Sequence, residues 1–325
     1  KKCFNSNRDM RGGKQLKKYK LFHWLYNLWH IKSLRHNRDA YRRYGIHKPL
    51  FASISSKDFP DKTSKAWLDT DDAALIASSR EGFSDFDPST RSQIGQWSAK
   101  GYMILEKLFS DKEADDINAE INRLQHSGKL RFTNGNKLMF ANRLSPLIHD
   151  TCYDKRLTSV LDFLLDKKVV PFQTINFIRG SEQKAHSDSI HMTTYPLGYL
   201  IAVWIALEDI TLQNGPLFYY PGSHKLPFLF NSDYDNDSSP LTLGDKTYAD
   251  YEDMLQDILK QNEFQAVPFL AKKGDVLIWH ANLVHGGMPI KDKNATRKSM
   301  VIHYYADDVI KYHEITERPS LMKLD

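Results

Sequence analysis

Two short stretches of the chain hold side chains that could bind one metal ion. In AHSDSIHMTT, residues 185–194, His186 and Asp188 stand two apart, and His285 follows in NLVHGG, 97 residues after Asp188. Side chains at positions i and i+2 of an extended chain point the same way, so His186 and Asp188 can reach one point in space. Two imidazoles and one carboxylate on one face of a first-row metal leave open positions, as non-haem Fe(II) oxygenases require. Glycines 286 and 287 would let the backbone beside His285 approach closely.

A single cation makes this pattern more specific. An H-x-D tripeptide alone arises often by chance, and its usual meaning is a hydrogen-bonded loop. Arg297 lies twelve residues after His285 and opens the segment SMVIHYYA. An Arg guanidinium can donate two hydrogen bonds to one carboxylate. It could therefore bind the far carboxylate of a dicarboxylate ligand whose keto acid end chelates the metal. Read alone, Arg297 is a surface charge, and Lys298 is the competing cation.

Three other histidines have plainer readings. His191, three residues after Asp188, could face a substrate or could be a loop residue with a solvent partner. His280 lies five residues before His285, near the end of an expected strand, and we expect His224, in PGSHK, to be a turn residue.

Helix signals dominate the first half of the chain and strand signals the second. The expected helices cover residues 15–44, 88–100, 110–125, 156–166 and 248–262. Ser110 and Glu113 form an S-x-x-E capping box at the start of the third. The expected strands, rich in β-branched and aromatic residues, cover 102–109, 169–178, 199–210, 217–223, 264–270, 275–280 and 299–306. This order predicts an α+β chain whose C-terminal half is a β-sandwich or barrel, with residues 224–263 inserted as a lid or rim.

The composition excludes several classes of protein. Of the 325 residues, 41% are hydrophobic and 26% charged, an ordinary globular balance. Cys3 and Cys152 form no paired motif, so neither a disulfide framework nor a cysteine zinc site is expected, and a cytoplasmic, reducing location fits. No apolar run is long enough for a transmembrane segment, and LFHWLYNLWHI (21–31) is too broken by polar residues for a secretory signal.

The charge is concentrated at the N-terminal end. Residues 1–50 hold 14 Lys and Arg against two Asp, whereas the rest of the chain is mildly acidic. Apolar residues at near-helical spacing, among them Trp24 and Trp29, lie between these basic residues. Such a segment could contact nucleic acid, an anionic membrane surface or an acidic partner. We expect instead an amphipathic helix that docks its Leu and Trp face on the body of the protein.

From about residue 97 onward the sequence resembles the phytanoyl-CoA dioxygenase family of Fe(II)- and 2-oxoglutarate-dependent oxygenases. The matching segments, about two thirds of the chain, are GYMILEKLFSDKEADDI (101–117), INFIRG…HSD (175–188), AVWIALEDITLQNGPLFYYPGSHK (202–225), KKGDVLIWHANLVHGG (272–287) and the region of Arg297. Within them NGPLFYYPGSHK is particularly specific. The resemblance implies a double-stranded β-helix (jelly-roll, cupin-like) core over residues 96–325, with the insertion 224–263. A basic helical N-terminal extension, residues 1–95, would flank this core.

The resemblance also implies a role for each matching residue. The iron ligands would be His186, Asp188 and His285, and Arg297 would hold the C5 carboxylate of 2-oxoglutarate. Relatives line the co-substrate pocket at the positions of Asn176 and Trp204, although Trp204 could equally be plain core.

Two departures and two substrate candidates refine this picture. Some relatives carry a Lys directly after the Asn, but Phe177 stands here, so we expect that contact to be missing. Halogenating relatives replace the acidic ligand with a small residue, and the presence of Asp188 therefore favours hydroxylation. His191 and Tyr195 are the candidates for contact with the substrate.

The expected function is hydroxylation of a small-molecule substrate by O2, with release of succinate and CO2. The alternative is a catalytically inactive jelly-roll protein that recognises a sugar or a protein partner through residues 224–263. A jelly-roll enzyme with a different metal, such as a cupin-type isomerase, fits the H-x-D spacing and Arg297 less well.

Overall fold

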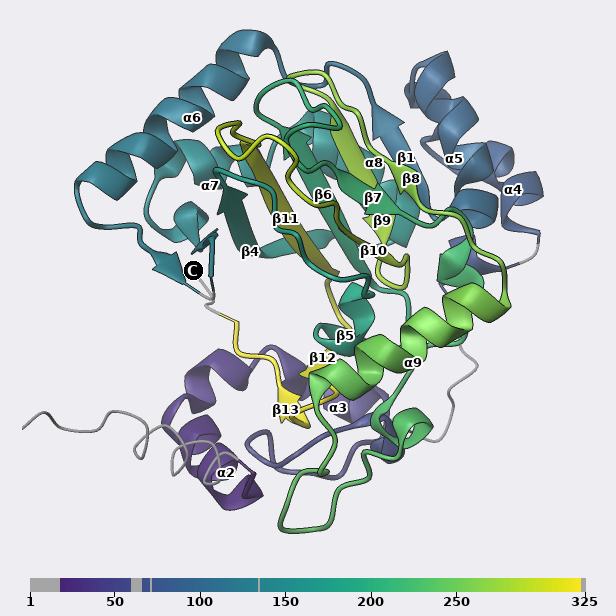
Figure 1. The fold of residues 1–325 in the computed structure, drawn as a ribbon. Helices are drawn as coiled ribbons and strands as arrows, with labels where there is room; N and C mark the ends of the chain where they lie inside the picture. The colour runs from purple at the N-terminus through teal and green to yellow at the C-terminus, as the bar shows by residue number, and fades with distance from the viewer. Residues whose placement is uncertain (1–17, 60–65, 71, 134, 323–325) are drawn as a thin grey trace, which may run out of the picture.

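The computed structural model describes residues 18–322 except 60–65, 71 and 134 (Figure 1). Its centre is an antiparallel seven-stranded sheet in the order β1-β9-β6-β11-β4-β3-β2. The strands of this sheet are β1 (Tyr102–Leu105), β2 (Phe132–Thr133), β3 (Lys137–Met139), β4 (Val169–Phe177), β6 (Leu200–Ala206), β9 (Val276–His280) and β11 (Ser299–Ala306). Most of them coincide with the expected strands, although β6 and β1 end earlier.

A second, three-stranded sheet packs against one face of the first. It consists of β10 (His285–Gly287), β7 (Leu217–Tyr219) and β8 (Val267–Pro268), in that order. Inward-pointing side chains of the two sheets, such as Trp204 and Tyr219, share one buried cluster. Two facing antiparallel sheets with side chains interdigitating between them form the expected jelly-roll core.

Helices cover the other face of the large sheet. They are α6 (Asp111–His126), α7 (Pro146–Cys152) and α8 (Lys155–Leu165), and their apolar sides enter a core shared with β6, β9 and β11. The capping box forms as expected, because Ser110 Oγ accepts from the Glu113 N–H and Glu113 in turn accepts from the Ser110 N–H. The chain is thus α+β, with helices on one face of the large sheet and the small sheet on the other.

The N-terminal part packs against a third small sheet. This sheet has the order β13-β12-β5 and consists of β5 (Thr193–Tyr195), β12 (Ile310–His313) and β13 (Arg318–Pro319). The expected single helix over 15–44 is wrong in the described residues 18–44: α2 (Lys20–Trp29) and α3 (Asn37–Arg43) are separate, with a 3-10 turn between them. This break lets Ala40 and Tyr41 reach the apolar cluster around β12. Residues 15–17 lie outside the described residues.

The orientation of α2 is opposite to the expectation. Its leucines and Trp29 are exposed, whereas Lys20 and Asn27 are buried against the body. Trp24 alone of the predicted face turns inward, and its Nε1 donates to Ser53 Oγ. The polar groups of the body, described below, decide this orientation.

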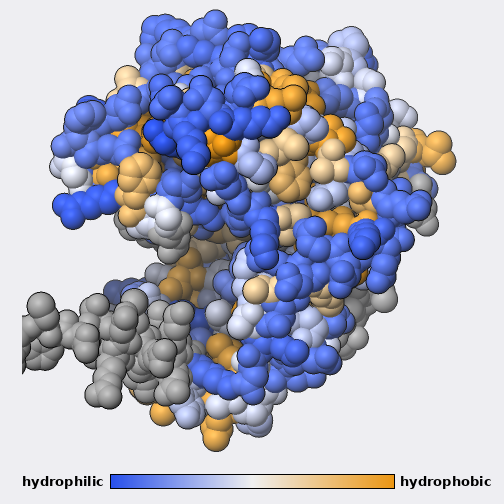
Figure 2. Space-filling model, viewed as in Figure 1, coloured by the Kyte–Doolittle hydropathy of each residue, from blue (hydrophilic) through white to orange (hydrophobic). Residues whose placement is uncertain are grey.

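The remaining helices bring the N-terminal part and the insertion onto the core. Helix α5 (Pro88–Lys100) packs beside β1, and α4 (Ala73–Ile76) packs on α5. Helix α5 runs across residue 95, and the domain boundary expected there stays a prediction. In the insertion, α9 (Tyr248–Gln261) confirms the expected helix, and its buried residues pack on the segments that carry His186 and His285. The face in Figure 2 is largely hydrophilic, with a hollow between its upper and lower parts.

Candidate metal centre

Backbone pairing joins the two segments that carry the histidines. His186 and His285 form an antiparallel bridge in which each N–H donates to the other's carbonyl oxygen at 2.9 Å. Strand β10 begins at His285 and pairs with β7, while Asp188 opens a short 3-10 turn. The two stretches that are remote in the sequence are therefore held side by side by main-chain hydrogen bonds.

The ligand atoms of the three residues converge as the spacing predicts. One potential ligand atom from each of His186, Asp188 and His285 lies within 4.8 Å of the other two. Among the described residues, these three form the cluster of His, Cys, Asp or Glu side chains that could hold a metal ion. The Nε2 atoms of both histidines are 3.9 Å from Asp188 Oδ1. All three residues are buried. The three side chains together could therefore hold one metal ion.

Both imidazoles present an unprotonated nitrogen to this point. His186 Nδ1 lies 2.9 Å from the Lys184 carbonyl oxygen and His285 Nδ1 lies 3.0 Å from that of Leu283. A carbonyl only accepts, so we assign the proton to Nδ1 and the lone pair to Nε2 in each ring. Burial, together with His285 nearby, lowers the pKa of His186 to about 3, which keeps its ring neutral at pH 7.

The carboxylate is fixed by donors on its other oxygen. Trp279 Nε1 donates to Asp188 Oδ2 at 2.9 Å, and His303 Nε2 lies 3.5 Å from the same atom. Burial alone would raise the pKa of Asp188, but the imidazoles of His285 and His303 outweigh it and hold the pKa below its ordinary value. Oδ1 is left to face the two Nε2 atoms.

Arg297 is a buried cation in the same cavity. Its side chain is 2% exposed, and its guanidinium lies over the rings of Phe177 and Trp204, at 5.2 and 5.6 Å. Nη1 donates to Ser299 Oγ at 3.3 Å, but Nε has no hydrogen-bond partner, and no carboxylate of the described residues makes an ion pair with this guanidinium. Burial lowers its pKa to about 10, so it is still protonated at pH 7. A buried cation without an anion is costly, which fits a site for an anionic ligand.

One cavity of about 380 Å³ connects the metal ligands to this cation. Among the predicted residues, it is lined by His186, Asp188, His191, Trp204, His285 and Arg297. Lys298, the competing cation, is instead directed to Glu208, with its Nζ 3.8 Å from the carboxylate. His280 Nε2 lies 3.1 Å from Asp69 Oδ2, and the group of potential metal ligands consists of the other three residues.

Two predicted site residues do not line the cavity. Ile175 and Phe177 on β4 face it, and because alternate residues of a strand point to opposite sides, Asn176 faces the helix-covered side. Tyr195 lies outside the cavity lining as well, because it stacks on Phe59 with ring centroids 4.1 Å apart and belongs to the N-terminal core cluster.

Several cavity residues were missed by the sequence analysis. They are Lys137, Gln173, His303 and His313, and each offers a hydrogen-bond donor to the cavity. The alternation along SMVIHYYA was a signal for His303, because Val301 two residues earlier also faces inward. Lys137 and His313 lie on short strands with no comparable pattern.

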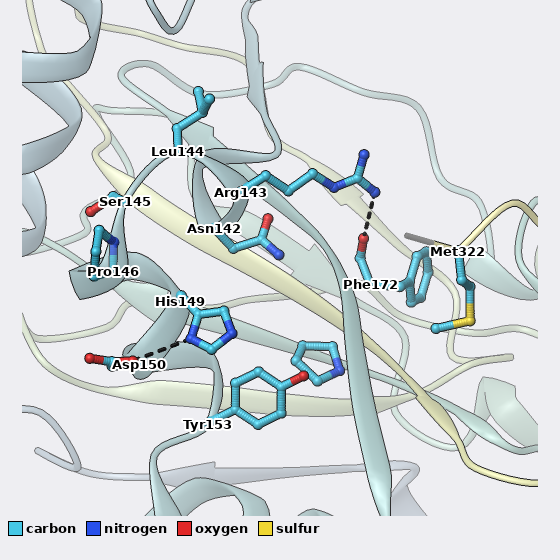
Figure 3. A pocket seen from close by; sticks show the side chains of 11 residues that line it. Asn142, Arg143, Leu144, Ser145, Pro146, His149, Asp150, Tyr153, Phe172 and Met322 are labelled. Atoms are coloured by element: carbon cyan, nitrogen blue, oxygen red, sulfur yellow. Dashed lines mark hydrogen bonds and ion pairs between the residues drawn. The ribbon is translucent and has the colours of Figure 1, made fainter. Parts of the chain in front are cut away.

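A second cavity, of about 450 Å³, lies between α7 and β4 (Figure 3). Arg143 Nη2 donates to the Phe172 carbonyl oxygen at 3.4 Å, and His149 contacts Asp150 at 3.2 Å. Its lining includes none of the three candidate ligands. The chemistry therefore belongs to the smaller cavity.

Curated relatives carry the same family description. Phytanoyl-CoA dioxygenase domain-containing protein 1 of Danio rerio is 34% identical over 107 residues, which is 33% of each chain. Phytanoyl-CoA dioxygenase 1 of Oryza sativa subsp. japonica is 26% identical over 194 residues, 57% of this chain and 58% of that protein. The chain spans about a third to a half of the length of the first relatives it matches.

Solved structures share the fold at low sequence identity. The α-ketoglutarate-dependent carbocyclase SnoK from nogalamycin biosynthesis has a TM-score of 0.57 at 16% identity, with 74% of this chain and 89% of that chain covered. EctD from S. alaskensis, solved with 2-oxoglutarate and 5-hydroxyectoine, has a TM-score of 0.55 at 19% identity, with 84% and 94% covered. At such identities the similarity shows the jelly-roll fold alone. The family model for phytanoyl-CoA dioxygenase matches residues 97–299, well over half of the sequence, and the chain therefore belongs to the phytanoyl-CoA dioxygenase (PhyH) family.

Proposed function

We propose that this protein is an Fe(II)- and 2-oxoglutarate-dependent dioxygenase that hydroxylates a small molecule. The observation that carries the proposal is one cavity that holds both the convergent His-Asp-His set and an unpaired, buried guanidinium. Relatives in the family and the solved structures named above, described with α-ketoglutarate or 2-oxoglutarate, support the same reading.

The residues present fit both groups. His186, Asp188 and His285 would hold the iron through two neutral imidazoles and one carboxylate oxygen, a set that leaves positions open for co-substrate and oxygen. Arg297 would receive the far carboxylate of 2-oxoglutarate, which would supply the partner its Nε lacks. When bound there, Fe(II) and 2-oxoglutarate would supply the oxidant for a substrate C–H bond, with O2 consumed and succinate and CO2 released.

The protein's own contribution is orientation and exclusion of water. The carbonyls of Lys184 and Leu283 fix the tautomers of the two histidines, and Trp279 fixes the carboxylate. Such outer hydrogen bonds set ligand geometry and basicity. The rings of Phe177 and Trp204 shield the guanidinium, so its attraction for a carboxylate is stronger than it would be in water.

The rest of the cavity wall favours a polar, acidic substrate. Lys137 lies in the cavity lining, with no ion pair to an acidic side chain of the described residues, and burial lowers the pKa of its amine. His191 and His313 lie side by side with ring centroids 5.3 Å apart, and Tyr248 of α9 packs on His191 at 4.6 Å. We infer that a substrate carboxylate or similar acceptor group meets Lys137 and His191, with α9 closing one side of the site.

The test begins with ligand binding. Anaerobic addition of Fe(II) and 2-oxoglutarate should give a weak metal-to-ligand charge-transfer band in the visible spectrum. His285→Ala should lose the band, while His126→Ala, an exposed histidine on α6, should keep it. A folded wild-type protein without the band would overturn the proposal and favour an inactive binding protein.

A substrate screen follows on the same samples. In air, succinate release should be stimulated by carboxylate-bearing metabolites more than by neutral ones of the same size. Lys137→Met should raise the KM for the stimulating compound while leaving the charge-transfer band intact. Equal stimulation by neutral compounds would contradict the inferred substrate class but not the proposed activity.

A further inference from the structure

Helix α2 exposes its apolar side and buries its polar side. The exposed side chains run from 45% for Phe22 to 87% for Trp29. They form the apolar face of α2, which consists of Leu21, Phe22, Leu25, Tyr26, Leu28 and Trp29. At the helical period these six residues share one side. We propose that the apolar face of α2 inserts into the interfacial layer of an anionic lipid membrane.

Polar contacts hold this orientation in place. Lys20 Nζ forms a buried ion pair of 2.6 Å with Glu317 Oε2 and donates to Ser238 Oγ at 2.9 Å. Asn27 Nδ2 donates to the Phe51 carbonyl oxygen at 3.0 Å, while Arg318 donates to Asn27 Oδ1 at 3.3 Å. Turning the apolar side inward would bury the Glu317 carboxylate without its ammonium, which is strongly unfavourable. The exposure of the apolar face is therefore built into the fold.

Cations follow the apolar face along the chain. Lys32, Arg35 and Arg38 follow α2 and are exposed. None of the three forms an ion pair with an acidic side chain of the described residues. Aromatic and leucine side chains flanked by Lys and Arg characterise helices that lie in the membrane plane, where the apolar side enters the acyl boundary and the cations meet anionic headgroups. The apolar face favours a lipid surface over nucleic acid, whose contacts are mainly charged and polar.

The length of α2 decides how it would bind. The helix has ten residues, and none of the helices among the described residues is long and apolar enough to cross a membrane. It would therefore lie parallel to the surface, with the jelly-roll core outside the bilayer (Figure 1). The proposal rests on α2 and the cations that follow it, and it is independent of the proposed activity.

Vesicle co-sedimentation of the full chain tests the proposal. We expect binding to vesicles of phosphatidylcholine mixed with phosphatidylserine, weaker binding to pure phosphatidylcholine, and a partial loss of binding as salt rises. The double substitution Leu25→Glu with Trp29→Glu should lower the partition coefficient by about tenfold or more, since both side chains would lose their apolar burial. Leu75→Glu, at an 80% exposed position on α4, is the matched control and should bind as the wild type does.

Circular dichroism and Fe(II) binding of the double variant would show that the fold is intact. Failure of the wild-type chain to bind anionic vesicles would overturn the proposal. Binding that survives both glutamates would overturn it as well. Sedimentation of the protein without vesicles would reveal self-association. If the wild-type chain formed a dimer that Trp29→Glu converts to monomer, and bound no lipid, the apolar face of α2 would instead be a contact with a second copy of the chain.

Discussion

The indole of Trp279 holds one oxygen of Asp188 and leaves the other for the metal. Its Nε1 donates to Oδ2 at 2.9 Å, whereas Oδ1 lies 3.9 Å from the Nε2 atoms of His186 and His285. Trp279 is part of β9, the strand next to β6 in the large sheet. A rigid strand thus orients a carboxylate that stands on a loop, and the geometry favours a single Asp188 oxygen as ligand.

The first prediction concerns this hydrogen bond. Trp279→Phe keeps an aromatic ring in the core but removes the donor, so the carboxylate loses its fixed orientation. We expect Fe(II) affinity to fall about 10- to 100-fold, as for other outer-sphere partners of metal ligands. Anaerobic titration would measure it. Trp97→Phe, a buried tryptophan in the helix-side core, should lower stability without changing metal affinity; equal affinity losses in both variants would assign the effect to packing.

The second prediction separates the two consequences of a buried cation. Arg297→Met removes the group that would hold the far carboxylate, so 2-oxoglutarate affinity should fall by about tenfold or more. The ligand-free protein, in contrast, should unfold at the same or a higher temperature, because an unpaired buried charge is replaced by an apolar side chain of similar length. Isothermal titration and thermal unfolding would measure the two effects. A Met variant that binds 2-oxoglutarate normally would remove Arg297 from the site.

The sequence was sufficient where spacing alone decides geometry. His186 and Asp188 could be placed together because they stand two positions apart on an extended chain, and His285 because the family motif fixes its order. Asn176 could not be placed, because a shift of one residue along β4 exchanges the cavity side for the helix side. The relevant register depends on pairing with β11, which is remote in the sequence.

The same limit explains the wrong expectation for α2. Periodicity identifies an apolar stripe but does not say which side of the helix meets the body. That choice depends on Glu317 and on the Phe51 carbonyl, whose positions are set by the folded chain. Tyr195 was a substrate candidate because residues 189–198 were expected to form a loop near the site, but β5 pairs with β12 and Tyr195 stacks on Phe59.

The third prediction uses the close approach beside His285. A Cβ added at Gly286 would lie 2.7 Å from the Gln183 carbonyl oxygen and 2.7 Å from the Phe218 ring, so the backbone would have to move. Gly286→Ala should therefore destabilise the fold by about 1–3 kcal/mol and weaken metal binding by displacing His285. The control is Gly95→Ala in α5, where nothing lies within 4 Å, and a gain of roughly 0.5–1 kcal/mol is expected. Chemical denaturation and metal titration would compare them, and normal metal affinity in Gly286→Ala would contradict the close-approach argument.

The last prediction concerns pH and a buried lysine that is not part of the candidate metal group. Lys311 on β12 is 2% exposed, its Nζ donates to the Val309 carbonyl oxygen at 3.3 Å, and burial lowers its pKa to about 8. Between pH 8 and the ordinary lysine value of about 10.4, the folded state has released a proton that the unfolded state still holds, so this group makes stability rise with pH. Lys311→Met removes that contribution and should be more stable than the wild type below pH 8, by roughly 3 kcal/mol. The difference should shrink toward pH 10. Denaturation at several pH values would measure it, and two parallel stability curves would show that Lys311 is not held in a desolvated site.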